Sequence, residues 1–170
     1  GETPLSVQWV WPGKLPYESR LAALKEFCKL LAREWAGFES RGHPMEVGQD
    51  FQDHILPKLL ESFNATLKAE PMPWLAALVC CSVFDLALHD AYGQLLRLPV
   101  YETYTAEFMN RDLADCLEQV DSAAVSFVGK YPADFLEAKP PEQLRAWHLV
   151  GGLDVLAADE LTGKGPNDGY

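Results

Sequence analysis

The segment from Pro73 to Arg97 constrains the fold of this chain more than any other. Pro73 suits the first turn of a helix, and apolar residues then recur at helical spacing as far as Leu95. The apolar residues fall on more than one face, and small side chains between them let another element approach closely. The pattern predicts a continuous, central and buried helix over residues 73–97, which Leu98-Pro99 ends.

Two shorter amphipathic stretches precede this helix. Residues 17–36 place Leu24, Phe27, Leu31 and Trp35 at three- and four-residue steps, and Gly37 is positioned to end the helix. Residues 38–47 are expected to form a loop. A second helix is expected over residues 48–67, with a kink or a restart at Pro57, because a proline inside a helix costs about 3 kcal/mol.

The rest of the chain is less regular. Residues 1–16 are expected to be extended, with a short strand at 7–11 as one option, and a short helix is possible at 111–119. We expect a mainly α (α+β) fold with three principal helices. It divides into a helical region at 1–120, an irregular loop or insertion at 121–146, and a third part at 147–170. That part opens with a buried strand at Trp147–Val150. Both ends of the sequence look cut, so we expect a piece of a longer protein.

Charge and hydropathy narrow the class of partner. Lys and Arg number 14 against 25 Asp and Glu, for a net charge of −11. That acidity argues against a nucleic-acid partner. No run of about 18 uninterrupted apolar residues occurs, and no signal peptide opens the chain, so we expect no membrane partner and a cytoplasmic protein.

The four cysteines do not form a recognisable zinc pattern. Cys28, Cys80, Cys81 and Cys116 contain no C-x-x-C pair. We interpret them as free thiols in a reducing cytosol, with a redox or metal role as the alternative. The adjacent Cys80 and Cys81 are a poor candidate for a structural bridge.

One dipeptide suggests metal chemistry. His89-Asp90 on a helix is one element of the pattern of HD-type metal phosphohydrolases, which also requires a histidine upstream and an aspartate downstream. The residues available for those roles are His43, His54, Asp112 and Asp115. The alternative is that His89 is a partly exposed helix residue and that Asp90 pairs with a local donor.

Other short motifs are weaker. Asp85 and Asp90 lie about 140° apart around a helix and so do not form a carboxylate pair. Gly163-Lys164-Gly165 lacks the phosphate-loop pattern. Asn64-Ala65-Thr66 matches a glycosylation sequon, which we discount because nothing suggests secretion. The loop Gly42–Glu46 could contact a ligand, although loop polarity explains it equally well.

Residues 82–101 resemble the long helix of the enolase superfamily, in its mandelate racemase and muconate lactonizing branch. That branch carries a run of the form A-x-D-x-A-L-x-D-x-x-G-K-x-x-x-x-P-V-Y. The positions in register here are Asp85, Ala87, Leu88, Asp90, Gly93, Pro99 and Tyr101. The chain differs in having His89 where Trp is common and Gln94 where Lys is common, and its segment 102–146 is longer than the usual link to the barrel.

The resemblance implies a fold and a chemistry. It implies that this chain is the helical part of an N-terminal capping domain, without its three-stranded meander, and that Trp147–Gly152 begins a (β/α)7β barrel. Such enzymes abstract a proton alpha to a carboxylate, as lyases, racemases or cycloisomerases, with Mg²⁺ stabilising the resulting enediolate and a Lys or His as base. The bases and metal ligands lie on barrel strands.

No catalytic, cofactor-binding or metal residue is therefore assigned to this chain. Mg²⁺ is expected in the complete protein and not here, and this chain alone is expected to be inactive, contributing the lid over the active site. Its implied partners are the missing barrel domain and a small carboxylate substrate, with a homo-oligomer left open. The alternatives are a non-catalytic helical interaction module and, third, the phosphohydrolase.

Overall fold

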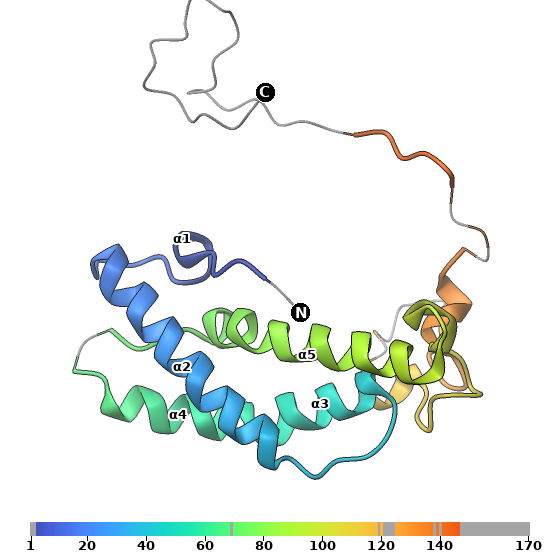
Figure 1. The fold of residues 1–170 in the computed structure, drawn as a ribbon, viewed down its shortest axis with the longest axis horizontal. Helices are drawn as coiled ribbons and strands as arrows, with labels where there is room; N and C mark the ends of the chain where they lie inside the picture. Colours follow the sequence, from blue (N-terminus) through green and yellow to red (C-terminus); the bar gives the residue numbers. More distant parts are fainter. Residues whose placement is uncertain are drawn as a thin grey trace, which may run out of the picture. The chain divides into compact units, whose positions relative to one another are not determined.

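The computed structural model describes residues 3–68, 70–118, 120, 125–137, 139 and 141–146. The chain divides into two compact units, Gly1–Glu137 and Ala138–Tyr170. The described residues are mainly helical and contain no strand, which confirms the mainly α expectation. The strand expected at Trp147–Val150 lies outside the described residues. All described helices belong to the first unit (Figure 1).

Helix α2 (Tyr17–Gly37) forms where the sequence predicts a helix. It buries Leu24, Phe27 and Leu31 on one side, as their spacing requires. The strand considered for residues 7–11 is wrong, because Val7–Val10 form the short helix α1. Arg20 of α2 fixes this turn: its buried guanidinium donates to the carbonyl oxygen of Trp11 and, at 3.0 Å, to the side chain of Gln8.

The second predicted helix is two helices. Helix α3 (Pro44–His54) and helix α4 (Leu56–Thr66) are separated at Ile55, with Pro57 in the first turn of α4. The restart at this proline is confirmed, since proline is tolerated in a first turn and costs stability in a helix interior. The expected start at residue 48 is wrong, because α3 begins at Pro44, inside the segment expected to be a loop.

Helix α5 (Trp74–Leu96) is continuous, as predicted. Arg97 follows it in the left-handed conformation (φ 58°), and its N–H bonds back to the last turn. The Asn64 side chain holds the preceding loop by exchanging two hydrogen bonds with the backbone of Met72, at 2.8 and 3.0 Å. Asn64 of the glycosylation sequon therefore has a structural role within the chain.

The core lies between α2, α4 and the first half of α5. Figure 1 shows α2 inclined to α5, and the two helices are in direct contact. The fully or nearly fully buried residues at their contact are Leu24, Phe27, Leu31, Ala76, Ala77, Cys80 and Cys81. Phe63 of α4 packs on Phe27 with ring centroids 5.1 Å apart. The small side chains of α5 allow α2 to approach, as the sequence pattern indicates.

The segment after α5 contains three short 3-10 helices. Helix η1 spans Val100–Thr103, η2 spans Leu113–Asp115 and η3 spans Pro132–Phe135. The α-helix considered for residues 111–119 is thus a single 3-10 turn within the described residues. Two backbone hydrogen bonds hold residues 130–133 against residues 104–113. The Leu113 N–H donates to the Lys130 carbonyl, and the Ala133 N–H donates to the Tyr104 carbonyl.

Candidate functional site

Helix α5 carries apolar side chains that the described structure leaves in water. Leu75, Val79, Ser82 and Leu86 fall on one stripe of the helix, because successive residues turn by about 100°. We call these four residues the α5 stripe. Its two leucines are exposed, whereas Val79 packs against the core and Ser82 is partly buried. Leu75 is 53% exposed and Leu86 is 49% exposed. The expectation of a buried α5 is therefore wrong at Leu75 and Leu86, and it holds for Ala76, Ala77, Cys80 and Cys81 on the side that faces α2.

The hydropathy of α5 makes this exposure notable. Its most apolar window of 18 residues has a mean hydropathy of 1.5, and only 22% of that window is buried. By length and composition alone, α5 is the one helix in the described residues that could cross a membrane. That is weak evidence, because core helices of water-soluble proteins pass the same test. The expectation that the chain has no membrane partner stays a prediction.

A polar joint connects α3, α5 and the segment after α5. It is built around His43, which is fully buried and precedes the first residue of α3. The His43 Nδ1 accepts from the N–H of Met45 at 3.2 Å. The Nε2 lies 2.9 Å from Oγ1 of Thr103, whose hydroxyl itself donates to the Val100 carbonyl at 2.6 Å. These partners require a neutral ring with its proton on Nε2.

The same joint holds a buried carboxylate. Glu46 accepts hydrogen bonds from the His43 N–H at 3.0 Å, the Asn110 side chain at 2.9 Å and the Arg111 N–H at 2.7 Å. The Arg111 guanidinium then donates to the Glu46 carbonyl and to Asp50 of α3. Burial alone would raise the pKa of Glu46, but these donors outweigh it and lower the pKa. Glu46 is thus a structural anion that ties residues 110–111 to α3.

Titratable side chains of α5 face His43 across the joint. The rings of His43 and His89 lie 6.2 Å apart, and Tyr104 packs on both rings. The His89 Nδ1–H donates to the Asp85 carbonyl at 2.9 Å and lies 3.7 Å from the Asp85 carboxylate. Burial lowers the pKa of His43, which His89 lowers further, and burial raises the pKa values of Asp85 and Tyr104.

The position of Asp85 explains why α3 has a glycine at position 48. A Cβ added to Gly48 of α3 would lie 2.5 Å from Oδ1 of Asp85. The two helices therefore approach at this point because α3 has no side chain there. Asp85 occupies the contact between the two helices, and Asp90 is exposed.

The structure does not bring together all the residues considered for a metal site. His43 and His89 meet in the joint, but His54 is exposed at the last residue of α3. Asp112 accepts from the N–H groups of Ala114 and Gly129, and Asp115 pairs with Arg111. Within the described part of the chain, no group of three or more His, Cys, Asp or Glu side chains could hold a metal ion.

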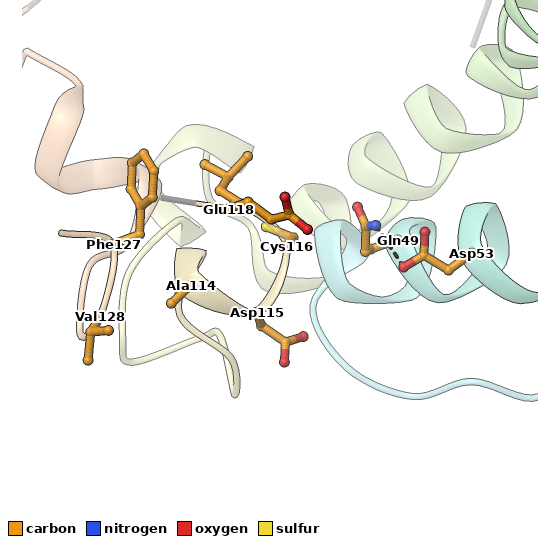
Figure 2. A pocket seen from close by; sticks show the side chains of 9 residues that line it. Gln49, Asp53, Ala114, Asp115, Cys116, Glu118, Phe127 and Val128 are labelled. Atoms are coloured by element: carbon orange, nitrogen blue, oxygen red, sulfur yellow. Dashed lines mark hydrogen bonds between the residues drawn. The ribbon is translucent and has the colours of Figure 1, made fainter. Parts of the chain in front are cut away.

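A hollow of about 560 Å³ opens beside α3. Figure 2 shows Gln49 and Asp53 of α3 on one side and Phe127 and Val128 on the other, with Gln49 donating to Asp53 at 2.8 Å. Asp115 and Glu118 add two more carboxylates to the lining. Burial, together with Asp115, raises the pKa of the Cys116 thiol, so this cysteine is not an activated nucleophile. The hollow offers acidic groups and no activated base.

Sequence reasoning missed most of the joint. Thr103, Tyr104, Asn110 and Arg111 come from a segment without periodicity, and their contacts to α3 span more than fifty residues of sequence. One local signal was present in the sequence: a Pro directly after His43, with Glu46 three residues beyond it, is the pattern of a helix start with a capping box.

Comparisons with known proteins identify no relative of this chain. No family model, no curated protein and no solved structure matches this chain.

Proposed function

We propose that this chain is the helical capping region of an enolase-superfamily enzyme, and that it serves as the lid of a (β/α)7β barrel. The observation that carries the proposal is α5 itself. It is one unbroken helix that holds the resembling residues from Ser82 to Leu96, ends before Pro99, and leaves Leu75 and Leu86 of the α5 stripe about half exposed. A helix of this hydropathy is stabilised by covering its exposed leucines, so we expect a partner surface.

The individual motif positions support the same proposal. Asp85 packs against Gly48, and Gly93 is buried where the chain folds back after α5, so both have roles within this fold. Asp90 and Tyr101 are exposed. The Tyr101 ring packs on Tyr104 at one edge, whereas Asp90 faces solvent. We expect the exposed motif position Asp90 to contact something outside the described fold, and the barrel domain is the partner that the resemblance implies.

The complete enzyme would then hold a divalent metal, normally Mg²⁺, in its barrel. When bound, the metal would stabilise the enediolate formed when a proton is removed next to a carboxylate. No residue described here is assigned to that chemistry. The role of this chain is to exclude water and to shape the space above a small carboxylate substrate.

The sequence beyond Tyr170 provides the decisive test. A Lys-x-Lys motif is expected within about 30 residues, followed by acidic residues at the ends of three successive strands, because base and metal ligands lie at the carboxyl ends of barrel strands. A reading frame that continues without these residues would refute the proposal.

A second candidate is a helical interaction module without chemistry, and the exposure of the α5 stripe favours it equally. The two candidates differ in the sequence they require beyond Tyr170, since a module needs neither Lys-x-Lys nor the acidic strand ends. The phosphohydrolase interpretation is the third candidate. It predicts a metal ion in the purified chain that the substitution His89→Ala removes, and metal analysis tests it directly.

A further inference from the structure

Two cysteines far apart in sequence lie side by side in the core. Cys80 of α5 is fully buried, and its Sγ donates a hydrogen bond of 3.7 Å to the carbonyl oxygen of Leu24 on α2. Cys28 lies one turn after Leu24 on α2. Helical side chains lean toward the N-terminus, so the Cys28 side chain covers the turn that carries this carbonyl. Both cysteines belong to the same packed cluster.

The two thiols differ in exposure and acidity. Cys28 is partly exposed, whereas Cys80 is enclosed. Hydrogen bonding between the two thiols lowers the pKa of Cys28 and raises the pKa of Cys80. An oxidant in solution can reach the partly exposed Cys28 and not the enclosed Cys80, so Cys28 is the thiol that reacts first. Cys80 lies next to Cys28 and can react with its oxidised side chain.

We propose that Cys28 and Cys80 form an oxidation site, at which a hydroperoxide converts the two thiols into a disulfide that joins α2 to α5. The Cys28 thiolate attacks the O–O bond of the hydroperoxide. An S–O bond forms, the O–O bond breaks, and the leaving oxygen departs as water or alcohol with a proton. The Cys80 sulfur then attacks the Cys28 sulfenic acid. The S–S bond forms, the S–O bond breaks, and the hydroxide leaves as water with the Cys80 proton.

The electron balance is complete without another reagent. The two thiols lose two electrons in total, the hydroperoxide gains two, and a dithiol such as dithiothreitol reverses the change. The other two cysteines are less suited to the first step. Burial raises the pKa of Cys81 to about 11 and raises the pKa of Cys116 as well, so both remain thiols near neutral pH.

Intact-mass and peptide mapping after peroxide treatment test this site. The reduced full chain is treated with hydrogen peroxide, quenched with catalase, denatured and alkylated. The expected result is a loss of about 2 Da, two alkylated cysteines instead of four, and one cross-linked peptide pair that contains Cys28 and Cys80. The mass loss and the cross-link should disappear after dithiothreitol.

Matched variants separate the site from general thiol oxidation. Cys28→Ser should abolish the cross-link, and Cys116→Ser should leave it unchanged. Treatment in urea should remove the preference for this pair, because the packing of α2 on α5 is lost. If Cys28→Ser fails to fold, the mapping of the natural chain still decides. Oxidation to sulfinic acid without a cross-link, or linkage of Cys28 to Cys81 or between two chains, would overturn the proposal.

Discussion

Gly93→Ala is the substitution whose effect the structure defines most sharply. Gly93 lies buried in the last turn of α5, where the chain folds back over the helix. The Leu98 N–H donates to the Gly93 carbonyl at 3.1 Å, which holds the following segment in place. A Cβ at position 93 would lie 2.9 Å from the Leu98 carbonyl oxygen and 3.5 Å from the Val100 nitrogen. Both neighbours are backbone atoms and cannot rotate away.

Two opposing contributions determine the size of the effect. Forcing an extra methyl group into a packed site costs about 1–3 kcal/mol, whereas replacing a glycine inside a helix by alanine returns about 1 kcal/mol. The expected result is a free energy of unfolding lower by about 1 kcal/mol. For a chain of this size, that corresponds to a melting temperature lower by about 2–4 °C.

Gly37→Ala is the matched control. Gly37 is the last residue of α2, and a Cβ there would meet nothing within 4 Å. Its stability should be unchanged or slightly higher. Urea unfolding followed by circular dichroism, at several protein concentrations, measures both variants. If Gly93→Ala is as stable as Gly37→Ala or more stable, the close approach of the chain after α5 is refuted.

Three further predictions concern the polar joint and the α5 stripe. Glu46→Gln should lower the free energy of unfolding by about 3 kcal/mol, because an amide cannot accept all the charge-assisted bonds that Glu46 accepts; urea unfolding measures this, with the exposed Glu61→Gln as control. His43→Asn should remove a pH-dependent part of the stability. The folded pKa of His43 is lowered, so the folded chain binds fewer protons than the unfolded chain. This contribution to stability is therefore complete above about pH 6.5 and is lost as the pH falls below it. Urea unfolding at pH 7.5, 6.5 and 5.5 should give a smaller difference in stability between natural chain and variant at the lowest pH, and an equal difference at all three would contradict the argument. The isolated chain should self-associate through the α5 stripe, and Leu86→Ser should weaken association more than Leu95→Ser on the opposite side of α5. Analytical ultracentrifugation measures the association of each variant. A monomer with a sharp, concentration-independent melting transition would count against self-association.

The helices that the sequence predicted well are those with a long local pattern. Helices α2 and α5 each extend over more than twenty residues, so apolar spacing alone defines them within a residue or two. Helix α1 could not be found in this way because it has only four residues, and Arg20 from another helix fixes it. The predicted start of α3 is wrong because Pro44 follows a loop-like sequence, although proline favours a first helical turn.

The candidate site was harder to predict, since its contacts are not local. The pairing of Glu46 with Asn110 and Arg111 depends on how the chain returns to α3 after α5, and no spacing rule encodes that return. The contact of Cys80 with α2 likewise depends on the packing of two helices. Composition did show that α5 is unusually apolar, but it could not show which of its sides would remain exposed.

The hydrogen bonds made by the polar groups of the joint bear on what this part of the chain can do. In the polar joint, His43 uses both ring nitrogens and Glu46 uses both carboxylate oxygens on donors and acceptors of this chain. Groups employed in this way hold the fold together and are poorly placed to transfer protons to a substrate. The α5 stripe differs, because Leu75 and Leu86 gain nothing from exposure to water. Covering these two leucines would stabilise the helix, which agrees with the covering role that we propose.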